Sequence, residues 1–244
     1  MIRIVVPMSG EGRQFAERGY SFPKPLVEID GRPLIEIVVR NLTPSEPHEF
    51  VFVCRREHLE QFALGEVLRL VAPGCRIVPT NKPTAGALCS VLLGVEYFQH
   101  EDELLVANAD QHLGVPVDRF LAAARAEGCD GSIMTFPNTH PRWSYVRTEG
   151  GRVVAVAEKL PISRHATVGL YYFRRGVDFV RGAERMLLKN ASFGGEFYVA
   201  PVFNELVLQG KHIVMFPIAS SDMQGLGTPE EVERFQAARH AQAA

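Results

Sequence analysis

The sequence feature that most constrains the fold of this chain is the junction between its first apolar segment and the loop that follows. Apart from Arg3, residues 2–6 are apolar and β-branched, show no helical spacing and stop at Pro7, which predicts a short buried strand. Two glycines then precede an arginine, in the order Met8, Ser9, Gly10, Glu11, Gly12, Arg13. Glycine admits positive φ and lets backbone N–H groups approach a ligand. Such a loop at a strand end can surround an oligophosphate.

A second cation follows this loop. Lys24 lies between Pro23 and Pro25, which stiffen the backbone on both sides. Arg13 offers a fixed fork of donors and Lys24 a localised charge, so the pair suits a nucleoside triphosphate. A surface turn would explain the glycines alone. The loop matches neither GxxxxGK[ST] nor GxGxxG, which argues against a P-loop ATPase and a dinucleotide-binding dehydrogenase.

Composition narrows the class of protein. The 244 residues include 26 basic and 28 acidic side chains, so no charge pattern for nucleic acid or an anionic membrane is present. No apolar run approaches the ~20 residues of a membrane-spanning helix, and the N-terminal segment does not resemble a leader. Four scattered cysteines indicate reduced thiols. We expect a soluble cytoplasmic enzyme, with its oligomeric state, a homo-oligomer included, left open.

The order of predicted elements indicates an α/β fold. Strands that alternate with helices imply right-handed crossovers and a largely parallel sheet. We expect strands at 26–29, 49–54, 76–78, 103–107, 131–136, 166–173 and 211–217, a hairpin of 143–148 with 152–158, and helices at 33–40, 57–71, 84–98, 117–127, 176–189 and 230–241. No repeat or linker interrupts the chain, so one domain over residues 1–244 is predicted.

Two later segments carry candidate site residues. Thr84 can cap a helix, and Ala85 and Gly86 keep its first turn free of bulk, so that a flat base can lie against the backbone. A helix start packed tightly on the sheet would explain the same residues. Asn108 and Asp110 follow the predicted strand 103–107. A carboxylate there suits Mg²⁺, although a role as a turn or helix cap stays open.

The opening of the chain resembles the sugar-1-phosphate nucleotidyltransferases, the family of nucleotide-sugar pyrophosphorylases. Relatives usually read Leu-Ala-(Ala or Gly)-Gly-x-Gly-x-Arg and then Pro-Lys-Pro-Leu. This chain keeps the glycines, the arginine and the Pro-Lys-Pro-Leu of residues 23–26, but Pro7 and Met8 depart from the pattern, as in a divergent member. The resemblance implies a Rossmann-like mixed, mainly parallel sheet flanked by helices, with a nucleotide-binding part over about 1–136. A small β-rich acceptor-binding portion would occupy about 137–244.

The resemblance also implies roles for residues of the nucleotide-binding part. Arg13 and Lys24 would hold the triphosphate, and Asp110 would bind Mg²⁺. The nucleotide would contact the first loop, the small-residue segment and the end of the strand, through Met8, Ser9, Gly10, Glu11, Gly12, Thr84, Ala85, Gly86 and Asn108.

In the second part, the resemblance implies that Lys159 holds the attacking phosphate and that Glu158 and Gly169 orient the acceptor. Without the resemblance, Glu158 and Lys159 would be read as a solvated surface pair. Glu196 would contact the acceptor from a helix in the segment 194–201, or simply interact with that helix's dipole. Ser144 stands where relatives commonly carry a glycine, so the acceptor pocket is expected to be altered.

The closing segment departs from the family pattern. Many relatives read Asp-x-Gly-Thr-Pro there and supply a second metal carboxylate, but this chain has Gly225 at that position. Asp222, three residues earlier, is a weak substitute because of its spacing.

The implied reaction is Mg²⁺-dependent attack of a sugar-1-phosphate on the α-phosphorus of a nucleoside triphosphate, which gives a nucleotide sugar and pyrophosphate. Three alternatives stay open. They are a nucleotide-sugar-dependent glycosyltransferase, a cytidylyltransferase for a small non-sugar phosphate, and a non-catalytic nucleotide-sensing subunit.

Overall fold

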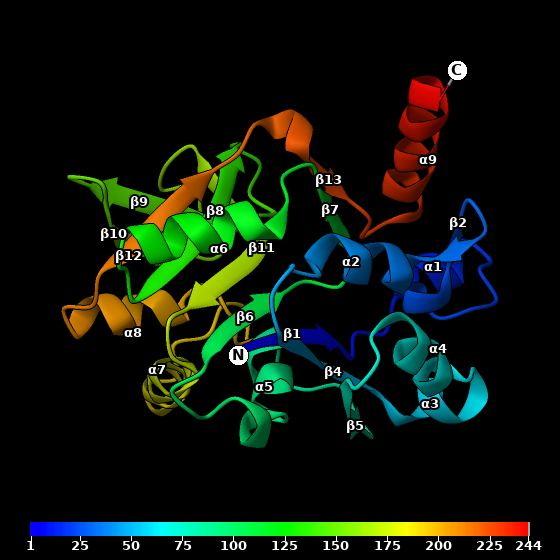
Figure 1. Ribbon diagram of the computed structural model, residues 1–244, viewed down its shortest axis with the longest axis horizontal. Helices are drawn as coiled ribbons and strands as arrows, with labels where there is room; N and C mark the ends of the chain where they lie inside the picture. The colour runs from blue at the N-terminus through cyan, green and yellow to red at the C-terminus, as the bar shows by residue number, and fades with distance from the viewer. Residues whose placement is uncertain (244) are drawn as a thin grey trace.

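The computed structural model describes residues 1–243, and a nine-stranded mixed sheet forms their centre (Figure 1). The strand order is β10-β9-β11-β6-β1-β4-β5, and β8 pairs with both β11 and β12. The strands are β1 (Ile2–Met8), β4 (His48–Arg55), β5 (Arg76–Thr80), β6 (Glu103–Ala107), β8 (Gly131–Pro137), β9 (Tyr145–Glu149), β10 (Arg152–Ala157), β11 (His165–Phe173) and β12 (Ile213–Pro217). The expected α/β class is confirmed.

Strand direction divides the sheet. β1 runs parallel to both β4 and β6, and β4 runs parallel to β5. β11 instead runs antiparallel to β6, β8 and β9. The carboxyl ends of β1, β4 and β6 therefore meet at one edge, the edge at which ligands bind in open α/β sheets.

Helices cover both faces of this sheet, as the apolar strands require (Figure 1). Ile4 and Val6 of β1 pack into one core and Val5 into the other, so the strand is buried on both sides. The first core includes α2 (Leu34–Leu42), α4 (Leu64–Val71), α6 (Val117–Ala126) and α9 (Pro229–Ala243). The second includes α5 (Ala87–Leu92), α7 (Gly176–Leu188) and α8 (Val202–Leu208). None of the helices within residues 1–243 is long and apolar enough to span a membrane.

Two predicted helices are shorter than expected. The helix expected over 57–71 is divided into α3 (Arg56–Gln61) and α4, because Ala63 adopts a left-handed conformation with φ 51°. The helix expected from Thr84 begins at Ala87, because Gly86 is not helical at φ 113°. A 3-10 turn follows α5.

Short elements near the predicted site also differ from expectation. Residues 24–26 form a 3-10 turn, and only β2 (Glu28–Ile29) of the expected strand 26–29 is extended, paired with β3 (Arg32–Pro33). An unexpected strand, β7 (Gln111–Leu113), pairs antiparallel with β13 (Met223–Gly225). This pairing brings the closing segment beside Asp110, whose carbonyl accepts the N–H of Leu226 at 2.7 Å.

The prediction of a helix at 194–201 is wrong. Phe193 and Glu196 exchange backbone hydrogen bonds of 2.9 and 3.0 Å across a tight turn. The two central residues, Gly194 and Gly195, have φ of 59° and 81°, and successive positive φ values favour a turn over a helix. Glu196 is therefore not at a helix start, and the alternative interpretation through a helix dipole is wrong as well.

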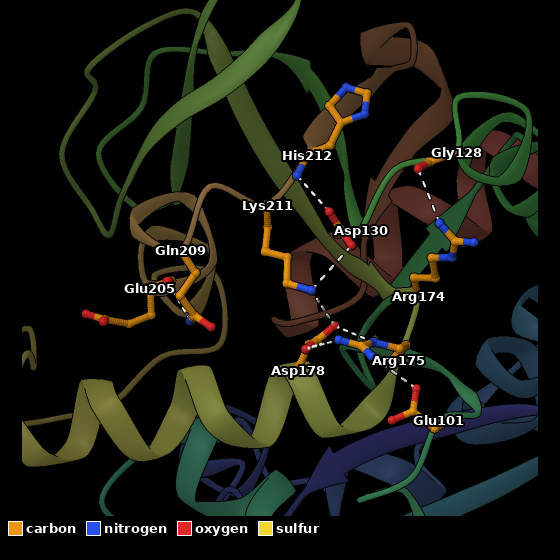
Figure 2. A network of polar contacts seen from close by, with 10 residues as sticks. All are labelled: Glu101, Gly128, Asp130, Arg174, Arg175, Asp178, Glu205, Gln209, Lys211 and His212. Atoms are coloured by element: carbon orange, nitrogen blue, oxygen red, sulfur yellow. Dashed lines mark hydrogen bonds and ion pairs between the residues drawn. The ribbon is translucent and has the colours of Figure 1, made fainter.

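A partly buried ionic network lies where β8, α7 and β12 begin (Figure 2). Lys211 lies between Asp178 and Asp130, with Nζ 3.1 Å from Asp178 Oδ2 and 3.5 Å from Asp130 Oδ1. Arg175 binds the same Asp178 carboxylate through two hydrogen bonds of 2.8 and 2.7 Å. Asp178 is 4% exposed, so these cations offset the cost of its burial.

Candidate active site

A cavity of about 760 Å³ opens at the carboxyl ends of β1 and β6. It gathers most of the residues predicted for the nucleotide: Met8, Ser9, Gly10, Glu11, Gly12, Arg13, Lys24, Thr84, Gly86, Asn108 and Asp110. Ala85 is not among the lining residues, and its carbonyl accepts the N–H of Phe197 at 2.7 Å. Glu196, expected at the acceptor, lines this first cavity.

The first loop packs directly against the Lys24 turn. Gly12 has φ of 62° and caps α1 (Arg13–Glu17). A Cβ at Gly12 would lie 3.2 Å from Cβ of Lys24, tighter than ordinary packing. The glycine therefore supplies both the left-handed conformation and the close approach that bring the loop to the lysine.

A chain of hydroxyls joins this loop to the small-residue segment. Ser9 Oγ lies 2.7 Å from Ser90 Oγ, and Ser90 Oγ lies 2.6 Å from Thr84 Oγ1. Thr84 also donates to the Gly86 carbonyl at 2.8 Å. Thr84 thus fixes the turn before α5 rather than capping a helix at its own position.

Arg13 is the most exposed of the predicted phosphate ligands. Its side chain is 78% exposed and pairs with Glu11 within the same loop. The hydrogen bond from Arg13 is the main reason that the pKa of Glu11 is lowered. No buried partner among the described residues holds the guanidinium, so it is free to turn toward an anion.

Lys24 and Asp110 form the central contact of the site. Lys24 Nζ lies 2.5 Å from Asp110 Oδ2, and the two side chains are 22% and 33% exposed. The closing segment passes over this pair, because a Cβ at Gly227 would lie 3.3 Å from Asp110 Oδ2. A cation and a carboxylate therefore meet at the cavity wall with part of each still accessible.

A second cavity, of about 290 Å³, adjoins the first. The two share Asn108, Asp110, Tyr198 and Gly227 as lining residues. The second cavity contains the predicted acceptor residues Ser144, Glu158, Lys159 and Gly169. Asp110 thus lies at the boundary between the two sets of predicted residues.

Glu158 is a buried carboxylate of the second cavity. It is 9% exposed, and burial raises the pKa of its carboxyl even though Ser144 Oγ donates to it and Lys159 is nearby. Ser144 therefore contacts Glu158 from the position at which a glycine is expected. A carboxylate with so few donors is ready to accept hydrogen bonds from a ligand.

Lys159 is held in an unusual conformation. Its φ of 53° is left-handed, which is costly for a residue with a side chain and is often found at functional sites. Lys159 Nζ donates to Tyr198 Oη at 2.7 Å, and Tyr198 in turn donates to Glu196. The hydrogen bond to Tyr198 is the main reason that the pKa of Lys159 is raised. Lys159 therefore stays cationic at neutral pH.

Gly169 makes the close approach of β11 to the end of β6 possible. Its φ is 83°, and a Cβ there would collide with the side-chain amide of Asn108. The Asn108 N–H donates to the Gly169 carbonyl at 2.9 Å. The glycine thus lets Asn108 lie between the two cavities.

Comparison with protein-family models gives one match, a MobA-like NTP transferase domain over residues 4–188. This match covers most of the chain. The chain belongs to the MobA-like NTP transferase family. Comparison with curated proteins gives no match.

Solved structures agree with this family. A nucleoside-diphosphate-sugar pyrophosphorylase from Vibrio cholerae RC9 is 26% identical, with a TM-score of 0.81 over 96% of this chain and 99% of that one. A UDP-glucose pyrophosphorylase complexed with UDP-glucose is 16% identical, with a TM-score of 0.78 over 99% and 100%. An inositol-1-phosphate CTP transferase from T. maritima is 16% identical, with a TM-score of 0.73 over 96% and 94%. The last two show the shared fold.

This NTP transferase has no carboxylate at Gly225, and the structure shows what occupies that space. A Cβ at Gly225 would lie 2.8 Å from both carboxylate oxygens of Glu231 in α9. Glu231 accepts the Gly227 N–H at 2.8 Å and pairs with Arg142 at 2.8 Å. Asp222 lies elsewhere, with its carbonyl bound to the Gly114 N–H across the far end of β7. It is therefore not placed to substitute for a carboxylate at position 225.

The residues around Asp110 fit a Mg²⁺ ion bound with substrate. Mg²⁺ usually takes one or two carboxylates and completes its shell with phosphate oxygens and water. Within the described residues, no group of three or more His, Cys, Asp or Glu side chains forms a self-sufficient metal site. Asp110, which is 33% exposed and lines both cavities, can supply the single carboxylate that a Mg²⁺ ion needs when substrate phosphates complete its shell.

Several lining residues of the NTP transferase were not predicted. Arg142, Trp143, Gln111, Tyr198 and Glu231 all line the second cavity. Only Glu231 had a local signal, because Thr228 and Glu231 have the spacing of a capping box and the Glu231 N–H donates to Thr228 Oγ1 at 3.2 Å. The others come from segments that meet only in the folded chain.

Proposed function

We propose that this NTP transferase condenses a nucleoside triphosphate with a sugar-1-phosphate, giving a nucleotide sugar and pyrophosphate. The observation that carries the proposal is the position of the Lys24–Asp110 contact. It lies where a cavity lined by the glycine loop meets a cavity lined by Glu158 and Lys159. Two anionic substrates placed in these cavities would meet beside this pair.

The proposed reaction is a displacement at phosphorus. A phosphate oxygen of the acceptor attacks the α-phosphorus, the bond from the α-phosphorus to the bridging oxygen of the β-phosphate breaks, and pyrophosphate leaves with the electron pair. The attacking phosphate is already anionic, so no strong general base is needed. The protein must bring two polyanions together and offset their charge.

Specific side chains supply these functions. Lys24 and Arg13 hold the triphosphate, and Arg13 exchanges its Glu11 partner for a phosphate oxygen. Lys159, fixed by Tyr198, holds the attacking phosphate. Glu196 assists by accepting the hydrogen bond of Tyr198, while Glu158, Ser144 and Gly169 form the acceptor wall.

Asp110 would hold the Mg²⁺ ion of the reaction. When bound, the ion supplies positive charge to the phosphate oxygens during bond cleavage. Lys24 would then move from Asp110 to the phosphates, because the ion replaces it beside the carboxylate. In the same proposal, residues of about 1–136 form most of the nucleotide-binding part and residues of about 137–244 most of the acceptor-binding part, with Ala244 outside the described residues. Glu196 lines the first cavity and Gln111 the second, so each part also contributes to the other cavity.

The test is a pyrophosphate-release assay with Mg²⁺. Four nucleoside triphosphates are crossed with a panel of sugar-1-phosphates, phosphocholine and inositol-1-phosphate. We expect a signal that requires both substrates, which would identify the base and the acceptor together. Asp110→Ala and Lys24→Ala should lose about a thousandfold in rate while keeping their thermal unfolding temperature within a few degrees.

Two outcomes would contradict the proposal. Full activity in Lys24→Ala would remove the assigned triphosphate site. Release of nucleoside diphosphate from a nucleotide sugar, with no pyrophosphate from any triphosphate, would instead indicate a glycosyltransferase.

A further inference from the structure

The acceptor cavity contains two hydrogen-bond donors without partners. Gln111 is 2% exposed, and its amide nitrogen has no hydrogen-bond partner within the described part of the chain. The indole Nε1 of Trp143 is likewise buried and unpaired among those residues. Both side chains line the second cavity. Buried donors are normally satisfied, so two exceptions at one cavity point to a ligand that completes them.

Gln111 is fixed in place by its neighbours. It lies in β7 opposite Gly225 of β13. On its other side lies Gly169, where a Cβ would lie 2.8 Å from Gln111 Oε1. The absence of a side chain at Gly169 therefore leaves room for this amide, whose nitrogen is unpaired among the described residues and can donate to a ligand.

Trp143 is fixed in a similar way. Its ring packs edge-to-face on Phe136 at a centroid distance of 5.2 Å. The Arg142 guanidinium covers the ring at 4.4 Å and is itself held by Glu231. The orientation of the indole, and with it the direction of its N–H, is thus set by two neighbours, Phe136 and Arg142.

Of the three aromatic residues that line this cavity, Trp143 and Tyr198 each have a cation of the protein over the ring, and Tyr171 is only 5% exposed. Arg142 lies over Trp143, and Lys159 Nζ lies 4.7 Å from the Tyr198 ring centroid. A quaternary ammonium group is recognised by open aromatic faces. Here it would meet two cations instead, so a choline-like acceptor is poorly matched to the cavity.

Hydroxyl groups match the same cavity well. A hydroxyl can accept from the Gln111 amide or the Trp143 indole, and can donate to the buried Glu158 carboxylate. A ring with several hydroxyls offers a partner to each of the three groups. A site built to hydrogen-bond such hydroxyls discriminates strongly against analogues that lack them, because its polar groups are then left unpaired.

We infer that Gln111 and Trp143 are specificity residues that read hydroxyl groups of the acceptor, and that the acceptor is a polyhydroxylated phosphate rather than the phosphate of a quaternary amine. This inference rests on the proposed nucleotidyl transfer and narrows its substrate. It assigns Gln111 and Trp143 to binding, with no part in bond making.

Binding can be measured directly, because Trp143 is the single tryptophan of the chain. We expect α-D-glucose-1-phosphate, galactose-1-phosphate or mannose-1-phosphate to change the tryptophan fluorescence saturably, and phosphocholine to leave it unchanged. Gln111→Met, which keeps length but removes the amide, should weaken that binding about tenfold. Gln209→Met, at the exposed position directly after α8, is the matched control and should bind as the unaltered protein does.

Deoxy analogues of the acceptor distinguish the loss of a hydrogen bond to one hydroxyl from a general distortion of the cavity by the substitution. The best sugar-1-phosphate is compared with its 2-, 3-, 4- and 6-deoxy forms in Gln111→Met and in Trp143→Phe, which keeps a ring but lacks the N–H. Each variant should raise KM about tenfold with kcat nearly unchanged. That penalty should disappear for the one deoxy analogue that lacks the partner hydroxyl.

The outcomes distinguish this inference from the function on which it rests. Pyrophosphate release that is faster with phosphocholine than with every sugar phosphate, or equal penalties for all deoxy analogues, would overturn the inference and leave nucleotidyl transfer standing. Absence of pyrophosphate release with every acceptor would overturn the proposed function and the inference together.

Discussion

Two buried carboxylates of this chain have opposite surroundings. Asp178, 4% exposed, receives hydrogen bonds from Arg175 and Lys211 (Figure 2). Burial alone would raise its pKa, but these bonds outweigh burial and the pKa of Asp178 is lowered. Glu158, 9% exposed, has the Ser144 hydroxyl as its donor, and burial raises its pKa.

The difference separates a structural group from a ligand-binding one. Asp178 is satisfied by the protein itself and joins α7 to β12. Glu158 remains short of donors, and the Gln111 amide and Trp143 indole of the same cavity have no acceptor within residues 1–243. Incomplete pairing on both sides of one cavity is what a polar ligand can complete.

The largest expected effect is on stability. Asp178→Ala leaves Arg175 and Lys211 beside each other without their shared carboxylate. We expect a loss of about 3 kcal/mol in the free energy of unfolding. This is the lower end of the range for a broken buried ion pair, because the Arg175 side chain is 35% exposed and water can still solvate it. Glu158→Ala should lower the free energy of unfolding by less than about 1 kcal/mol. The buried Glu158 carboxylate has few donors, so its removal also relieves the cost of burying its charge.

Urea denaturation measures the free energy of unfolding of both variants. The two values can be compared if the m-values of the variants are unchanged. Arg147→Ala, in an exposed pair of β9, is a control that should change little. Equal losses of stability in Asp178→Ala and Glu158→Ala would contradict the distinction between a structural carboxylate and a ligand-binding one.

The next effect is on activity. Glu158→Gln keeps the shape of the side chain but removes its charge, so acceptor hydroxyls lose a charged partner. We expect kcat/KM for the acceptor to fall about a hundredfold, equivalent to about 2.7 kcal/mol, with no loss of stability. Glu149→Gln, on the neighbouring β9 and 71% exposed, is the control. A fully active Glu158→Gln enzyme would remove Glu158 from the acceptor site.

The sequence predicts the fold well where periodicity and glycine positions are local signals. The apolar run of β1, the hairpin of β9 and β10, and the amphipathic α6 and α7 all lie close to their predicted ranges. The sequence also predicts the Gly-containing loop and Lys24 as candidate site residues, because they lie close together in the chain. These segments encode their conformation within a few residues.

Other features depend on contacts between distant segments. Gln111 and Trp143 have no local pattern. They line the same cavity because β7 pairs with β13 and β9, which follows Trp143, pairs with β11. The network of Asp178 joins residues from 130 to 211 in the same way. The helix predicted at 194–201 failed for a local reason, since Gly194 and Gly195 both take positive φ.

A smaller effect tests the hydroxyl beside Glu158. Ser144→Ala removes the side-chain donor that Glu158 has in the described part of the chain, which should cost about 1 kcal/mol of acceptor binding, or roughly fivefold in KM. It should also raise the pKa of Glu158 further, so that the pH profile for the acceptor shifts upward. Ser163→Ala, whose hydroxyl donates to the Val146 carbonyl instead, is the control. An unshifted profile in Ser144→Ala would show that Ser144 does not tune Glu158.

The smallest effect is the pH dependence of stability, and the two carboxylates should give opposite signs. The lowered pKa of Asp178 means that its stabilisation is complete above the unfolded value of about 3.9 and is lost as the pH falls through the folded pKa. The raised pKa of Glu158 means that its stabilisation is complete below the unfolded value of about 4.3 and is lost as the pH rises through the folded pKa. The destabilisation by Asp178→Asn should therefore shrink on acidification, whereas the relative gain of Glu158→Gln should grow from about pH 4 to neutrality. Urea titrations of both variants across this range measure the two slopes, and slopes of the same sign would contradict the assignment of one carboxylate to structure and the other to ligand.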